Sequence, residues 1–323
     1  MAEQKTRGNG ALKALLWTGV ALTAAAAVNA TIFYRTPPLW TRMPGGTAKW
    51  LPLPEGDISY EVAGEGKPLL LLHGIGAGCS SFEWQRLFGV LAETRQVYAP
   101  DLLGFGKSDK PKIAYTAETY LDFLEAFIEG AIGQQTDIIA SSLSGAFALA
   151  LAQRRPDLVG RLALVCPTGL EALSAPLKPE GKALQTALSL PILGASFYNL
   201  LTSRAGIRQY LKGRVYGHSE RVDDALVSQF HCAAHQPGSD NVLPYFVGGY
   251  LNCVIAEALL ALPDPPLVIW GASAVETPLA QADSFKKLRP DAELVILEGV
   301  GSLPHDEQPD AFFEAIQPWL SES

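Results

Sequence analysis

A serine at the end of an apolar segment is the residue best placed to do chemistry in this 323-residue chain. Ile138-Ile139-Ala140 is typical of a buried strand, and Gly145 to Gln153 is typical of a helix, with Ser142 between them. The residues two positions before and after Ser142, Ala140 and Ser144, are small. A very tight strand-to-helix turn needs small residues there, and it presents the central hydroxyl for attack on a carbonyl carbon. The pattern therefore predicts a nucleophile elbow with Ser142 at its apex.

A second segment could stabilise the negative charge that such an attack produces. His73-Gly74-Ile75-Gly76 follows the apolar run Leu69 to Leu72, which suits a central parallel strand. Preorganised backbone N–H groups stabilise the oxygen of a tetrahedral intermediate. We expect the N–H of Leu143 to be one donor and that of Ile75 or Gly74 to be the other. The His73 side chain is expected to be structural.

These segments and a third resemble the α/β-hydrolase superfamily over roughly residues 55 to 320. The third is Asp101-Leu102-Leu103-Gly104-Phe105-Gly106-Lys107-Ser108-Asp109, which is similar to the family's D-x-x-G-x-G-x-S motif. Strands that alternate with helices along the chain also predict an α/β fold with a doubly wound, mostly parallel sheet. Haloalkane or epoxide chemistry is disfavoured, since those relatives need a carboxylate where Ser142 stands. No cofactor is implied.

Two positions depart from the family pattern. The resemblance places the catalytic acid at Ala274, in Gly271-Ala272-Ser273-Ala274, and the catalytic histidine at Ser302, in Gly301 to Pro309. A serine without a base is a poor nucleophile at neutral pH. In a serine protease, loss of the base lowers kcat by a factor of about 10⁶. The sequence therefore predicts a nucleophile whose usual partners are missing.

Three nearby residues are candidate substitutes. His305 lies about one helical turn beyond the vacant histidine position, although it could equally be a partly exposed histidine at a helix N-terminus. Glu276 lies two residues beyond the vacant acid position, and Glu171 follows the preceding strand, where some family members place their acid. Three other histidines are weaker candidates, and they offer no third ligand for a metal: His218, His231 and His235.

The N-terminus carries a candidate transmembrane helix. About 21 residues from Ala14 to Tyr34 have no charge, which is enough to cross a bilayer. A cleaved signal peptide is the alternative, because Ala24 to Ala30 offers A-x-A-like cleavage sites. The length of the stretch and its end at Ile32-Phe33-Tyr34-Arg35 favour a retained anchor. Basic residues balance on the two sides, so the orientation stays open, with the cytoplasmic face favoured.

The remaining pattern gives a domain organisation. We expect a tail over 1–13, an anchor over 14–34, a linker over 35–48, an α/β core over 49–166 and 264–323, and a helical lid over 167–263. The lid is rich in leucine, which would suit a long hydrophobic ligand. A net charge of −8 without a basic run argues against nucleic acid. Four scattered cysteines are expected to be free thiols: Cys79, Cys166, Cys232 and Cys253.

Two functions remain open at this stage. The first is a membrane-anchored serine hydrolase for a hydrophobic ester or lipid-like substrate, with His305 as a displaced base and Glu276 as a weaker candidate. The second is a catalytically silent member of the fold that binds a ligand or serves as a subunit of a membrane complex. The serine and its oxyanion loop favour the first hypothesis. The vacancies at Ala274 and Ser302 favour the second.

Overall fold

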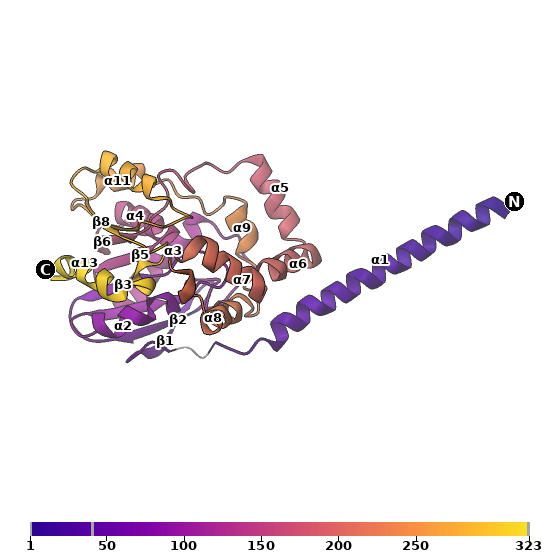
Figure 1. Cartoon of the computed structure of the whole chain (residues 1–323), viewed down its shortest axis with the longest axis horizontal. Helices are drawn as coiled ribbons and strands as arrows, with labels where there is room; N and C mark the ends of the chain where they lie inside the picture. Colours follow the sequence, from indigo (N-terminus) through magenta and orange to yellow (C-terminus); the bar gives the residue numbers. More distant parts are fainter. Residues whose placement is uncertain (1, 40–41, 322–323) are drawn as a thin grey trace.

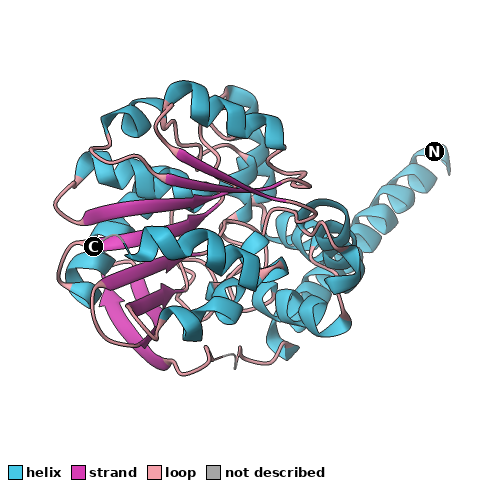
Figure 2. Cartoon of the chain, turned by 60° about the vertical axis from the view of Figure 1, so that its left-hand side comes forward, coloured by secondary structure: helices cyan, strands magenta, loops and turns pink. Residues whose placement is uncertain are grey.

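An eight-stranded sheet forms the centre of the protein (Figure 2). The structure is a computed structural model that describes residues 2–39 and 42–321; parts of the expected tail, linker and core (residues 1, 40–41 and 322–323) lie outside the described residues. The strand order is β1-β2-β4-β3-β5-β6-β7-β8. Strand β2 runs antiparallel to both of its neighbours, β1 and β4. All the other neighbouring strands pair in parallel. The strands are β1 Thr47–Leu53, β2 Gly56–Ala63, β3 Pro68–Leu72, β4 Gln96–Pro100, β5 Thr136–Ser141, β6 Val159–Val165, β7 Leu267–Gly271 and β8 Glu293–Leu297.

The leucine run of β3 shows why the sheet is buried on both faces. Side chains alternate between the faces of a strand. Leu70 and Leu72 pack into one hydrophobic cluster, with helices α3, α4 and α11. Leu69 and Leu71 pack into a second cluster on the other face, with α2 and α13. The helices beside the sheet are α2 Gln85–Leu91, α3 Ala117–Phe127, α4 Leu143–Arg154, α11 Ala282–Leu288, α12 Pro304–Glu307 and α13 Pro309–Ser321.

The predicted fold class is confirmed: the chain has an α/β fold with a mostly parallel sheet. One strand was not expected. β1 begins at Thr47, inside the segment predicted as a linker, and it pairs with β2 along seven residues. Its side chains are mostly exposed, so it lacks the apolar alternation by which strands are recognised.

The segment between β6 and β7 is helical, and it carries its own hydrophobic cluster around Ile207, Leu211 and Phe230. Leu303, which precedes α12, joins this cluster and ties the helical segment to the core. The helices of the segment are α5 Pro179–Leu188, α6 Pro191–Leu201, α7 Arg204–Tyr210, α8 Asp224–Ala234, α9 Leu243–Val247 and α10 Ala256–Ala261. Short turns of 3-10 or π type complete the chain at 81–84, 128–132, 211–215, 219–221 and 279–281.

Helix α1, Ala2–Arg35, extends away from the body of the protein (Figure 1). It continues through the segment expected as a separate tail. Within the described part of the chain, one helix is long and apolar enough to cross a membrane, at Trp17–Arg35. Near its C-terminal end, α1 packs against α6: Asn29 Nδ2 donates to Ser196 Oγ at 2.9 Å, and Asn199 Nδ2 donates to Asn29 Oδ1 at 3.0 Å. The helix is therefore attached to the helical segment and not only to the chain that follows it.

A buried ion cluster at the N-terminal end of β5 yields a stability prediction. Asp137 is fully buried, 2.7 Å from the Arg95 guanidinium, and accepts the Arg161 N–H at 3.0 Å. Burial acts to raise the pKa of Asp137, but the Arg161 N–H and the Arg95 side chain outweigh it and lower that pKa below its usual value. Asp137→Asn leaves a buried guanidinium without a carboxylate, so we expect the free energy of unfolding at pH 7 to fall by about 3 kcal/mol.

The stabilisation from Asp137 should depend on pH. A carboxyl group whose pKa is lowered by folding stabilises the protein above its unfolded pKa, about 3.9 for Asp, and this contribution is lost as pH falls through the folded value. Denaturant unfolding of the full chain at pH 7 and pH 3 should show the difference between wild type and Asp137→Asn shrinking in acid. Asp157→Asn, at an exposed ion pair with Arg155, serves as the control and should cost less than about 1 kcal/mol. An equal difference at both pH values would contradict the assignment.

Candidate active site

Ser142 lies at the strained turn between β5 and α4. Its φ of 54° and ψ of −123° fall in a region that non-glycine residues rarely adopt. Such strain persists only where the surroundings fix it, and it is concentrated at functional sites. Here the Ser142 N–H donates to Val165 O at 2.9 Å, across to the end of β6. Ser142 is partly exposed, whereas Ala140, Leu143 and Ser144 around it are buried.

The Ser142 side chain opens into a cavity of about 1040 Å³ between the sheet edge and the helical segment. Its wall near Ser142 is polar, with contributions from Glu83, Thr168 and Ser302. The wall formed by the helical segment is mostly apolar: it includes Leu200, Leu201, Ile207, Phe230, Leu243 and Phe246. The arrangement fits a ligand with a polar reacting group and a hydrophobic body.

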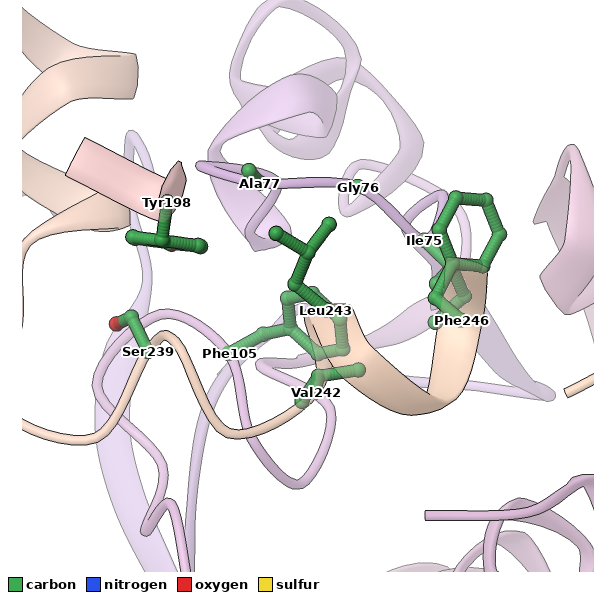
Figure 3. Close-up of a pocket in the computed structure, with 9 residues that line it drawn as sticks. All are labelled: Ile75, Gly76, Ala77, Phe105, Tyr198, Ser239, Val242, Leu243 and Phe246. Carbon is green, nitrogen blue, oxygen red and sulfur yellow. The ribbon is translucent and has the colours of Figure 1, made fainter. Parts of the chain in front are cut away.

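A smaller pocket beside it shows how the helical segment covers the oxyanion loop. In Figure 3, Leu243 projects toward the backbone of Gly76 and Ala77, while Ile75 and Phe246 lie together at one end. The pocket has a volume of about 20 Å³, which holds about one water molecule. Side chains of α9 therefore close one side of the loop that follows β3.

Two of the three expected oxyanion donors, Gly74 and Ile75, belong to residues that line the cavity, but the Gly74 N–H is already bonded. Leu143 is the first residue of α4, so its N–H has no acceptor within the helix. Ile75 lines the cavity. The Gly74 N–H, expected as the alternative to Ile75, instead donates to both carboxylate oxygens of Glu83, at 3.2 Å each. Leu143 and Ile75 therefore remain as the candidate pair of donors.

His73 and Asp101 hold this loop in place. His73 is fully buried, accepts the Leu102 N–H at Nε2 over 3.0 Å, and contacts Gly74 O through Nδ1 at 2.8 Å. Asp101 accepts the backbone N–H groups of Ser81 at 2.8 Å and Lys107 at 2.7 Å. The histidine thus links the loop after β3 to the loop after β4 and does not line the cavity.

The two vacant triad positions lie where the family pattern places them, after β7 and after β8. Ala274 is buried and contributes no polar side-chain atom. Ser302 lines the cavity, and its Oγ is buried without a hydrogen-bond partner among the described residues. No imidazole from the described part of the chain lines the cavity.

His305 does not reach the cavity that contains Ser142. It is fully buried in α12, stacked on Trp84 with ring centroids 4.0 Å apart and in edge contact with Phe312. Its Nε2 lies 3.4 Å from Glu83 Oε1. The expected movement of His305 toward Ser142 would have to break this stack, so the structure brings His305 to Glu83 instead.

The other candidate acids are engaged elsewhere. Glu276 lines the cavity but accepts a hydrogen bond from Arg214 at 3.3 Å, and its side chain is 40% exposed. Glu171 is exposed and accepts a hydrogen bond from Ser284, on α11.

The weaker histidine candidates have structural contacts. His235 Nε2 lies 3.1 Å from Thr202 Oγ1, and its ring is 4.2 Å from that of His231. Burial lowers the pKa of His231 to about 4. His218 pairs with Glu220 at 3.1 Å. These contacts place all three in the helical segment, away from Ser142.

Glu83 is the site residue that the sequence reasoning missed. It lies in the turn Ser81–Trp84, its side chain is 4% exposed, and it reaches the cavity beside Gly74. Nothing local distinguishes this glutamate from a surface residue.

The sheet topology and the strained serine define an α/β protein of the hydrolase class. A model described as "Alpha/beta hydrolase family" matches residues 69–315, and the chain belongs to this family. A Metapseudomonas resinovorans 2-hydroxy-6-oxo-6-(2'-aminophenyl)hexa-2,4-dienoic acid hydrolase is 27% identical over 274 residues, covering 82% of this chain and 88% of that protein. An uncharacterized protein of Mycobacterium tuberculosis is 28% identical over 275 residues, covering 81% and 77%.

Solved structures show the same fold. A serine hydrolase involved in carbazole degradation matches with a TM-score of 0.70 and 24% identity, covering 86% of this chain and all of that one. A membrane phospholipase A matches with a TM-score of 0.69 and 20% identity, covering 98% of this chain and all of that one. The fold, together with relatives named as hydrolases, supports a hydrolase enzyme.

Proposed function

We propose that the protein is a membrane-anchored serine hydrolase that acts on a hydrophobic ester or lipid-like substrate. The observation that carries the proposal is the strained Ser142, whose side chain opens into a large and mostly apolar cavity. A turn that stores backbone strain is costly, by about 1–3 kcal/mol, and a purely structural serine gains nothing from it.

In the proposed reaction, Ser142 Oγ attacks the ester carbonyl carbon while the serine proton passes to a base. The carbonyl oxygen becomes negatively charged and is stabilised by the N–H groups of Leu143 and Ile75. Collapse of this intermediate expels the alcohol and leaves an acyl group on Ser142. A water molecule then attacks the acyl-enzyme by the same route and releases the acid.

The shape of the cavity supports a hydrophobic substrate. Glu83, Thr168 and Ser302 contribute polar groups, and the helical segment supplies leucine and phenylalanine side chains together with fewer polar ones, such as Gln209 and Arg214. A volume of about 1040 Å³ exceeds what a short ester needs. The relatives named as dienoic acid hydrolases point to small acids, whereas the apolar wall favours a longer acyl chain.

The surface of the helical segment supports association with a membrane. Exposed apolar side chains gather on and next to α6, the helix that packs against α1: Leu190, Leu193, Phe197, Leu200 and Leu201 are each 40% exposed or more. Leu200 and Leu201 also line the cavity. A substrate dissolved in the bilayer could therefore enter the cavity past α6 without crossing water.

The comparison with the membrane phospholipase A agrees with this arrangement. That match covers 98% of the chain, a share that must include part of α1. The name of that protein supports a lipid substrate and a membrane location for the present one. Basic residues balance on the two sides of the anchor, so the proposal assigns no orientation beyond the cytoplasmic face favoured by the sequence.

A second candidate function is ligand binding without catalysis, possible for a subunit of a membrane complex. The observation that favours it is the replacement of the usual acid and histidine by Ala274 and Ser302, with no imidazole among the described residues that line the cavity.

Labelling by a fluorophosphonate distinguishes the two functions. The purified full chain in detergent should be labelled at Ser142, as located by peptide mass spectrometry. A long-chain ester added beforehand should slow the labelling, whereas a short-chain ester at the same concentration should have little effect. Absence of labelling at high probe concentration would overturn the hydrolase proposal and leave the ligand-binding function.

A further inference from the structure

The cavity contains few groups that can accept a proton from Ser142. Among the described residues, its lining includes two carboxylates, Glu83 and Glu276. Glu276 is paired with Arg214 and partly exposed to solvent. Glu83 is buried, and its side chain has no lysine or arginine partner among the salt bridges of the described residues.

Glu83 and the nucleophile both lie against Gly74. A methyl group placed on the Gly74 Cα would lie 3.6 Å from Ser142 Cβ, 3.6 Å from Ser141 Oγ and 3.9 Å from Glu83 Oε2. Ser141 also lines the cavity, and its Oγ is buried without a hydrogen-bond partner among the described residues. The glycine keeps its own position among these groups free of a side chain, and a general base needs to be within hydrogen-bond reach or one water away.

The surroundings of Glu83 fix its carboxylate at this point. The Gly74 N–H donates to both oxygens, and His305 Nε2 faces Oε1 at 3.4 Å. The stack of His305 on Trp84 holds the imidazole against the side of the carboxylate that is away from the cavity. Neither ring nitrogen of His305 has a hydrogen-bond partner among the described residues. The contact of Nε2 with Glu83 Oε1 is the ion-pair distance that the imidazole makes.

Two other ionisable side chains near Glu83, Cys79 and Tyr216, have raised pKa values. Burial, and then the charge of Glu83, raises the pKa of the Cys79 thiol well above its usual value. Burial, followed by Asp306, raises the pKa of Tyr216 in the same direction, with Glu83 and Glu307 contributing.

We propose that Glu83 takes the place of the missing histidine as the base for Ser142. The proposal rests on the hydrolase function proposed above. As the Ser142 Oγ–carbon bond forms, the serine proton passes to the Glu83 carboxylate, directly or through one water. The resulting carboxylic acid returns that proton to the departing alkoxide. In the second half, the attacking water gives its proton to Glu83, which restores it to Ser142 Oγ as the acid is released.

Glu83→Gln tests the proposal with little change of shape, because the glutamine oxygen can still accept the Gly74 N–H. General-base catalysis contributes about 10²–10⁴-fold, so we expect the fluorophosphonate labelling rate to fall at least about 100-fold. Glu83→Asp keeps the carboxylate and should recover part of that loss. The wild-type rate should decline on acidification, and this decline should be absent from Glu83→Gln.

Gly74→Ala provides an independent test. The added methyl group makes only ordinary contacts, so the fold should be retained, yet it would contact Ser141, Ser142 and Glu83 at once. We expect a loss of labelling rate with an unchanged thermal melting curve. Glu276→Gln is the comparison variant for the other carboxylate of the cavity.

The outcomes separate this proposal from the function on which it rests. A labelling rate at Ser142 that is the same in Glu83→Gln as in the wild type, or that falls only in Glu276→Gln, would overturn the role of Glu83. The hydrolase proposal would remain intact. Absence of labelling in the wild type would overturn both. Loss in Glu83→Gln with partial recovery in Glu83→Asp, in variants that melt like the wild type, supports the proposal.

Discussion

We expect Ser142→Ala to lower kcat/KM for hydrophobic esters by at least about 10³-fold. In subtilisin, loss of the nucleophile lowers kcat by about 10⁶, and what remains comes from the oxyanion donors and from binding. The effect should be smaller here because the base is a carboxylate and not the usual histidine, so the wild type starts from a lower rate. Hydrolysis of p-nitrophenyl esters with acyl chains of increasing length measures the loss.

Ser228→Ala is the matched control for this substitution. Ser228 is a partly exposed residue of α8, hydrogen-bonded to the Arg204 side chain and the Asp224 carbonyl and outside the cavity lining. It loses the same hydroxyl group, and its rates should stay within about threefold of the wild type, since surface substitutions usually change stability by less than about 0.5 kcal/mol. A wild-type ester hydrolysis rate that Ser142→Ala leaves unchanged would show that the activity resides elsewhere.

We expect a double substitution at exposed leucines on and next to α6, Leu190→Glu with Leu193→Glu, to separate membrane-bound from soluble substrates. These side chains are 53% and 55% exposed, neither lines the cavity, and α6 packs against the candidate anchor. Full burial of a leucine side chain contributes about 1.5–3 kcal/mol, and a charge in its place is disfavoured in lipid. Hydrolysis of a long-chain ester in phospholipid vesicles should fall at least about 10-fold.

The soluble substrate serves as the internal control. A short-chain ester in detergent reaches the cavity from water, so the double variant should hydrolyse it at a rate within about threefold of the wild type. Leu260→Glu introduces the same charge at an exposed leucine of α10, which packs against α4 and α11, and should leave both rates unchanged. Equal losses on both substrates would mean that the surface of α6 supports folding and not access from the bilayer.

The attachment of α1 to α6 gives this surface a fixed position relative to the candidate anchor. Asn29 is buried between Ser196 and Asn199, and the Phe33 ring lies 6.2 Å from that of Tyr198. A polar side chain within a membrane helix is costly unless it finds a partner. The pairing of Asn29 with α6 therefore draws the exposed leucines of that helix toward the end of the anchor.

Local patterns allowed the sequence to predict much of the fold. The leucine run at β3, the apolar segment before Ser142 and the alternation of strands with helices each reflect the backbone and its nearest neighbours along the chain. Small residues at Ala140 and Ser144 likewise predicted the strained turn, because the steric requirement there is local. β1 escaped prediction since its stability comes from pairing with β2 and not from its own apolar pattern.

Residues close together in the chain were enough to predict the family, the turn at Ser142 and the two vacancies at Ala274 and Ser302. The groups that surround the nucleophile became evident only from the folded chain. The fold placed His305 in a stack on Trp84 and brought Glu83 beside Gly74, although neither contact has a local pattern. Packing between distant segments sets such contacts, so the spacing of residues along the sequence could not predict them.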